Sequence, residues 1–167
     1  RDGNRFEKLA TTPLSRAEWL LAHSLVNVVV IGIAALLLLG LSVLVTGASV
    51  PLSLPTLAVV PFVALGVTLF CGLGAVIGSL ADSQDGVIAA SNAIALPLLF
   101  LSETFVTPDL LPAWFVPALN FSPLTYFARG VRALTYTGGA WVTDLGVLAG
   151  LAVAFFVLGT LAIPRTD

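Results

Sequence analysis

The sequence predicts an all-α polytopic membrane protein with four transmembrane helices, and two observations lead to this fold class. Hydrophobic residues make up 58% of the 167 residues and charged residues only 10%, whereas a soluble domain has about a quarter charged residues. Between Trp19 and Ala81 there is no Asp, Glu, Lys or Arg. A crossing helix needs roughly 20 apolar residues, so this stretch is long enough for two crossings. Barrel strands would alternate, and these runs do not.

The long uncharged stretch divides at residues 46–55, where glycine, serine and proline residues interrupt the hydrophobic pattern and predict a loop. Four spans follow within one domain that covers residues 18–163. They are expected at about residues 18–45, 56–80, 86–101 and 144–163. The third has about 16 residues and is marginal for a full crossing, which needs at least about 17.

The basic residues predict the orientation, because Lys and Arg accumulate in cytoplasmic loops. With an even number of spans both chain ends lie on one side of the membrane. That side holds five basic residues, which are Arg1, Arg5, Lys8, Arg16 and Arg165. The long loop on the other side holds two, Arg129 and Arg132. We therefore expect a multi-pass protein of the cell membrane with both termini cytoplasmic, including a short tail at 164–167.

The opening segment, residues 1–17, predicts a short amphipathic helix and a linker. Phe6 and Leu9 gather on one side of such a helix and basic residues on the other. Pro13 disfavours helix at the residue before it, and Ser15 with Glu18 fits a capping box that starts a new helix. Physical chemistry alone favours a basic anchor lying in the lipid headgroup layer.

The stretch at 102–139 predicts an outer re-entrant helical hairpin. Prolines at 108, 112, 117 and 123 rule out one continuous helix. The segment is nevertheless too apolar for a solvated loop, so we expect it to dip partway into the membrane, where broken backbone survives only inside protein or beside a wet cavity. Its aromatic residues suit an interfacial belt, and substrate contact is the alternative. These residues are Trp114, Tyr126, Tyr136 and, just beyond the segment, Trp141.

Few polar residues lie in the spans. His23, Asn27 and Asn92 are expected to hydrogen-bond to neighbouring helices, with substrate contact as the alternative. Glu103 follows the third span and is the better candidate for a functional acid, the alternative being a solvated helix end. Asn92 and Glu103 are thus the candidate residues of a substrate path.

Small residues suggest where helices approach one another. Gly74 and Gly78 form a G-x-x-x-G pattern, which permits close helix packing, and Gly146 with Gly150 form another. The single cysteine, Cys71, excludes an internal disulfide. The only histidine, His23, has no carboxylate near it in sequence, so intramembrane catalysis is disfavoured. An acidic pI near 5.2 argues against a nucleic-acid partner.

Three segments together resemble type-2 ABC exporter permeases. "GNRFEKLATTPLSRAEWLLAHSLVN" is similar to their cytoplasmic loop and following span. "GLGAVIGSLADSQDGVIAASNAIALPLLFLSETFVTPDLLPAWF" resembles a small-residue span, an inner loop, the next span and the outer hairpin. "FSPLTYFARGVRAL" is similar to the N-P-L-T-Y segment and the helix after it, except that Ser122 stands where the family commonly has Asn. A complete family member has two more spans ahead of this start, so the N-terminal part is expected to be absent.

The resemblance implies a permease subunit that moves a substrate of the drug, lipid or glycan class. It makes the opening segment a coupling helix, with Phe6 and Leu9 as anchors in an ATP-binding subunit and Glu7 and Lys8 as the polar rim. No P-loop motif is present around Lys8, the only lysine, so ATP and Mg²⁺ are expected in that separate partner and no cofactor in this chain. A second permease copy and membrane lipid are the other expected partners. A secondary transporter or a non-transporting structural membrane subunit is the alternative.

The predicted topology can be tested by cysteine labelling. Single cysteines at Asp2, Ser83, Thr137 and Thr166 in a Cys71→Ser background are expected to react with a membrane-impermeant maleimide from outside only at position 137. External labelling at position 83 would refute the orientation.

Overall fold

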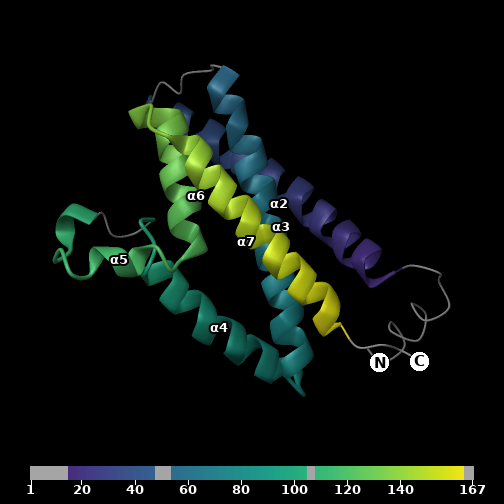
Figure 1. Ribbon diagram of the computed structural model, residues 1–167. Helices are drawn as coiled ribbons and strands as arrows, with labels where there is room; N and C mark the ends of the chain where they lie inside the picture. The colour runs from purple at the N-terminus through teal and green to yellow at the C-terminus, as the bar shows by residue number, and fades with distance from the viewer. Residues whose placement is uncertain (1–14, 48–53, 105–107, 164–167) are drawn as a thin grey trace.

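The computed structural model describes residues 15–47, 54–104 and 108–163, and every regular element in these ranges is helical (Figure 1). The elements are α2 (Arg16–Thr46), η1 (Leu54–Ala58), α3 (Val59–Leu80), α4 (Gln84–Phe100), η2 (Pro108–Leu110), α5 (Val116–Leu119), α6 (Pro123–Arg132), η3 (Ala133–Thr137) and α7 (Trp141–Ala162). The expected all-α class is confirmed. The predicted coupling helix lies outside the described residues.

Three helices are long and apolar enough to cross a membrane: α2, the η1–α3 segment from Thr56 to Leu80, and α7. They correspond to three of the four expected spans. The remaining one corresponds to α4, whose 17 residues reach about 25 Å at 1.5 Å per residue. This length is less than the roughly 30 Å of the hydrocarbon layer. The count of four crossings therefore stays a prediction.

The predicted start of the first long helix is confirmed in atomic detail. The Ser15 hydroxyl accepts a hydrogen bond from the Glu18 backbone N–H at 3.3 Å, and the Glu18 carboxylate accepts one from the Ser15 backbone N–H at 2.7 Å. This reciprocal capping box satisfies two N–H groups that a helix leaves free at its N-terminus. α2 ends at Thr46 and is capped by Gly47, whose φ of 66° lies in the left-handed region that favours glycine.

The three long helices lie side by side, with α3 in contact with both α2 and α7 (Figure 1). The start of α2, the end of α7 and the α3–α4 turn lie at one end of the bundle, and α6 leads into α7 at the other (Figure 1). The buried core is where α3, η3 and α7 meet. It contains Phe62, Leu69, Leu134, Leu148 and Ala152.

Two glycines set the close approach of α3 and α7. A Cβ added at Gly72 would lie 2.6 Å from the carbonyl carbon of Phe155, and a Cβ added at Gly159 would lie 2.8 Å from the Gly72 carbonyl oxygen. These neighbours are backbone atoms, which cannot turn aside as a side chain can. The two helices therefore cross at this distance only because both residues lack a side chain.

α6 also packs against the bundle through a glycine. Gly130 faces the ring of Phe62, and a Cβ there would overlap that ring. Phe62 is fully buried and packs edge-on against Phe127, with ring centroids 6.4 Å apart. The segment at 108–137 thus joins the bundle through α6, whereas α4 points away from the bundle (Figure 1).

The glycine crossing predicts a sharp contrast between neighbouring glycines of one helix. Gly72→Ala is expected to lower the free energy of unfolding by about 1–3 kcal/mol, because overpacking forces the α3 and α7 backbones apart. Gly74→Ala is the matched control, since nothing lies within 4 Å of the Cβ it would add. Both changes give the same gain in helix propensity.

Unfolding in mixed micelles, followed by circular dichroism, measures the difference. Equal stability of the two variants would show that the α3–α7 distance does not depend on Gly72.

Candidate functional site

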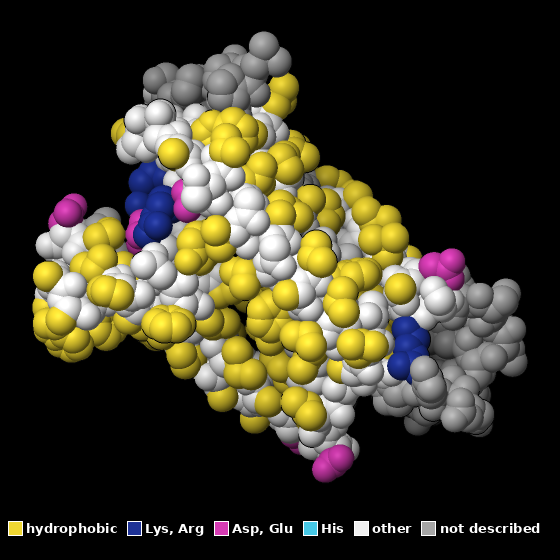
Figure 2. Space-filling view, in the orientation of Figure 1, with side chains coloured by type: hydrophobic (Ala, Val, Ile, Leu, Met, Phe, Trp, Pro, Cys, Tyr) yellow, Lys and Arg dark blue, Asp and Glu magenta, His cyan; other side chains and the backbone are white. Residues whose placement is uncertain are grey.

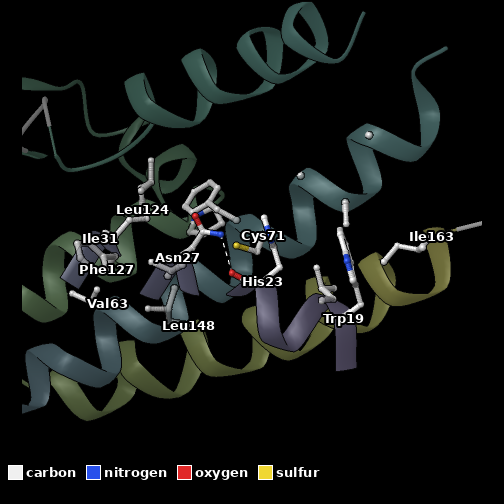
Figure 3. A pocket seen from close by; sticks show the side chains of 18 of the residues that line it. Trp19, His23, Asn27, Ile31, Val63, Cys71, Leu124, Phe127, Leu148 and Ile163 are labelled. Atoms are coloured by element: carbon white, nitrogen blue, oxygen red, sulfur yellow. Dashed lines mark hydrogen bonds between the residues drawn. The ribbon is translucent and has the colours of Figure 1, made fainter. Parts of the chain in front are cut away.

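A groove with a volume of about 1190 Å³ runs along the bundle between α2 and α3 and is closed at one side by α6 (Figure 3). Its residues come from four helices and two helix ends. They are Trp19, Leu20, His23, Asn27, Ile31, Ala35, Val63, Gly66, Val67, Phe70, Cys71, Gly74, Ala75, Gly78, Ser79, Ala81, Pro123, Leu124, Phe127, Leu148 and Ile163. A groove of this size is large enough to hold most of a drug-sized molecule.

The α2 wall of the groove changes from polar to apolar along its length. Trp19, His23 and Asn27 follow one another at four-residue spacing, so they lie on one face of the helix and in line in Figure 3. The rings of Trp19 and His23 are stacked, with centroids 5.5 Å apart and planes 2° apart. Further along α2 the wall continues with Ile31 and Ala35. One end of the groove therefore offers hydrogen-bonding and aromatic groups and the other only apolar surface.

Asn27 corrects one expectation from the sequence. Its side-chain amide donates a 2.9 Å hydrogen bond to the backbone carbonyl of His23, one turn earlier in the same helix (Figure 3). Within the described ranges, the Asn27 side chain makes no hydrogen bond to a neighbouring helix, which is where the bond was expected. This intrahelical bond holds the amide at the groove wall, where its Oδ1 remains available as an acceptor.

The second half of α3, from Cys71 to Ser79, lines the groove with small residues only. Gly74 and Gly78 both line it, and nothing lies within 4 Å of the position that a Cβ would take at either of them. α3 therefore has glycines on two faces. Gly72 packs against α7, whereas the predicted G-x-x-x-G pair faces open space. Gly146 and Gly150 of α7 are similarly open.

A second site lies at the end of α4, where Glu103 meets two arginines of α6. Both arginines pair with its carboxylate: Arg129 bonds to Oε1, through Nε at 3.2 Å and also through Nη2, and Arg132 bonds to Oε2 at 3.4 Å. Arg132 also donates a 2.8 Å bond to the Glu103 backbone carbonyl. Glu103 is 4% exposed, so the alternative of a solvated helix end is wrong.

A second acidic residue lies near this pair. Asp144, near the start of α7, is buried and interacts electrostatically with Arg129. The hydrogen bond to Glu103 raises the pKa of the Arg129 guanidinium above its ordinary value, so this residue stays protonated at any physiological pH. Two arginines and two acidic residues thus lie near one another where α4, α6 and α7 come together. In Figure 2, basic and acidic side chains touch at this end of a surface that is otherwise mostly hydrophobic.

Hydroxyl groups continue the same junction. The Ser122 hydroxyl donates a 2.7 Å bond to the carbonyl of Leu98, and the Thr125 hydroxyl lies 2.6 Å from the Leu119 carbonyl and 3.4 Å from that of Leu101. Carbonyls in the last turn of a helix have no partner within the helix. The side chains at the start of α6 therefore supply a C-terminal cap for α4. Ser122, the departure from the family pattern, makes one of these bonds.

The structure brings some of the candidate residues together and leaves others apart. Gly74 and Gly78 share the groove with His23 and Asn27. Asn92 is exposed on α4 and does not line the groove, and Glu103 lies in the ion-paired junction. The residues predicted for coupling, Phe6, Glu7, Lys8 and Leu9, lie outside the described residues.

Sequence reasoning missed the arginine partners of Glu103. Arg129 and Arg132 were counted only to predict the orientation in the membrane, although their three-residue spacing places them on one face of a helix. That spacing, together with the acidic Glu103 earlier in the chain, was the sequence signal that could have predicted the ion pairs. In the described part of the chain, no three His, Cys, Asp or Glu residues group as metal ligands would.

Long apolar helices, a groove of ligand size and an ion-paired junction define a helical membrane-protein domain. Residues 2–136 match the family model described as ABC-2 type transporter. The chain belongs to this family of ABC transporter membrane proteins. No solved structure gives a significant match.

Two curated proteins are similar to parts of the chain. The daunorubicin resistance ABC transporter permease protein DrrB1 of Streptomyces coeruleorubidus is 33% identical over 86 residues, which is 48% of this chain and 30% of that protein. Nodulation protein J of Rhizobium leguminosarum bv. trifolii is 33% identical over 116 residues, which is 67% of this chain and 44% of that protein. The chain thus spans less than half the length of either relative.

Proposed function

We propose that this chain is part of the membrane-spanning permease of an ABC exporter, which moves an amphiphilic substrate with ATP hydrolysed by a separate subunit. The observation that carries the proposal is the family match over residues 2–136. The relative named for daunorubicin resistance supports the drug class. Lipids and glycans are the other substrate classes that the resemblance allows.

The groove supports an amphiphile in particular. It combines a largely apolar surface with Trp19, His23 and Asn27 at one end. A substrate with a polar head and an apolar body could place each part against matching groups, because small-molecule sites are mostly apolar with a few polar groups that fix orientation. Both chain ends of this permease would be cytoplasmic.

The first test concerns the coupling helix proposed at residues 1–17. Burying a Phe or Leu side chain contributes roughly 1.5–3 kcal/mol, so Phe6→Ala with Leu9→Ala is expected to weaken binding of the ATPase subunit by about a hundredfold or more. The intact transporter carrying both changes should still insert in the membrane. It should lose co-purification with the ATPase and substrate-stimulated ATP hydrolysis.

Phe6→Leu with Leu9→Met is the matched control, because it keeps an apolar face and should retain the partner. If the double alanine variant, well expressed, still binds the ATPase and transports normally, the segment is a lipid anchor and the coupling role is refuted.

The second test concerns the second permease copy proposed as partner. Gly74 and Gly78 line the groove and face open space, so a second copy that approaches α3 there would place the groove at the interface between the copies. Gly74→Leu or Gly78→Leu is expected to reduce the yield of crosslinked permease dimer. Gly40→Leu on α2 serves as the control, because Gly40 is also open but belongs to no G-x-x-x-G pattern. An unchanged yield would move the dimer interface to another surface.

A further inference from the structure

α4 is attached to the rest of the bundle mainly at its two ends. None of its 17 residues is buried, although most of them are apolar. At one end, a turn at residues 81–83 joins it to α3. At the other end, a hydrogen bond from Ser122 and the ion pairs of Glu103 connect it to α6. A helix with so little packed surface has low local stability, so its position depends on those end contacts.

The strongest of these end contacts is the pairing of Glu103 with Arg129 and Arg132. The carboxylate is 4% exposed, but the two arginine side chains are 41% and 40% exposed. Each guanidinium group therefore keeps an open face while the ion pairs are in place, so it is not buried when the carboxylate leaves. Opening a partly exposed ion pair costs less free energy than opening a fully buried one. In a fully buried pair, each separated charge would be left without any partner.

α6 connects this contact to the groove. Pro123, Leu124 and Phe127 of α6 line the groove, and Arg129 and Arg132 follow on the same helix. A molecule that enters the groove and displaces α6 would therefore also displace the arginines that hold Glu103. α6 is therefore in contact with both the groove and the ion pairs of Glu103.

We propose that Glu103, Arg129 and Arg132 form an ionic latch that holds the outer end of α4, and that α4 pivots about the turn at residues 81–83 when the latch opens. The closed state has the ion pairs in place, and the open state has hydrated charges. The latch is a property of the fold itself. Its use in transport, with the groove ligand biasing the equilibrium, rests on the proposed function.

Distances between α4 and α7 test the latch directly. Spin labels replace Leu96 of α4 and Val153 of α7, which are 53% and 63% exposed. The intact protein, in a Cys71→Ser background and diluted with unlabelled copies, should give one narrow distance by pulsed electron paramagnetic resonance. Glu103→Gln is expected to add a second distance or to broaden the first. Arg129→Gln with Arg132→Gln should act in the same way.

Asp85→Asn is the matched control, because it removes a carboxylate from the other end of α4 and should leave the distance unchanged. Glu103→Asp shows whether the effect is simple unfolding. It keeps the charge but shortens the side chain, so it should broaden the distance distribution less than Glu103→Gln. A distribution that is unchanged in Glu103→Gln and in the double arginine variant would overturn the latch.

The distance measurement needs no transport activity. If the latch variants shift the distance but the wild-type protein moves no substrate, the latch stands and the proposed function fails. If transport is normal and the distances do not change, the latch fails and the proposed function stands.

Discussion

α3 and α7 cross at a pair of glycines, and the packing of the other helices follows from this crossing. Gly72 and Gly159 bring two helix backbones within van der Waals distance, and the buried core forms beside that crossing. In lipid there is little hydrophobic force to drive helices together, because the tails are as apolar as leucine. Close backbone packing supplies the attraction instead, so the position of α7 follows from the absence of two side chains.

α3 then determines where a ligand can be held. One of its faces is used by α7, and the opposite small-residue face remains open as the floor of the groove. α2 provides the wall with His23 and Asn27, and α6 closes one side. The groove is thus what remains uncovered after the close crossing has fixed the bundle, which explains why it is long and largely apolar.

Interactions of a different kind hold α4 in place. α4 buries no residue, and bonds from Ser122, Arg129 and Arg132 hold its end. Such bonds are strong where water is scarce, but they exchange partners when water enters. Apolar packing therefore fixes the bundle, whereas reversible polar contacts hold α4, and this division is what allows one helix to move while three remain in place.

The sequence by itself determined the features that depend on local pattern. Composition and uncharged length predicted the helical membrane class, and Ser15 with Glu18 predicted the start of α2 correctly. Both follow from neighbouring residues, which the chain order makes visible. The length of α4 left the fourth crossing undecided, because a marginal run of apolar residues does not say whether a helix spans or leans against its neighbours.

Only the tertiary structure decided which residues meet across helices. The G-x-x-x-G pattern pointed to Gly74, but Gly72 makes the crossing, because the direction a glycine faces depends on where the partner helix lies. Glu103 pairs with Arg129, 26 residues away, through a junction that no local spacing encodes. A linear pattern records the faces of one helix, whereas a contact between two helices also depends on their crossing angle and register.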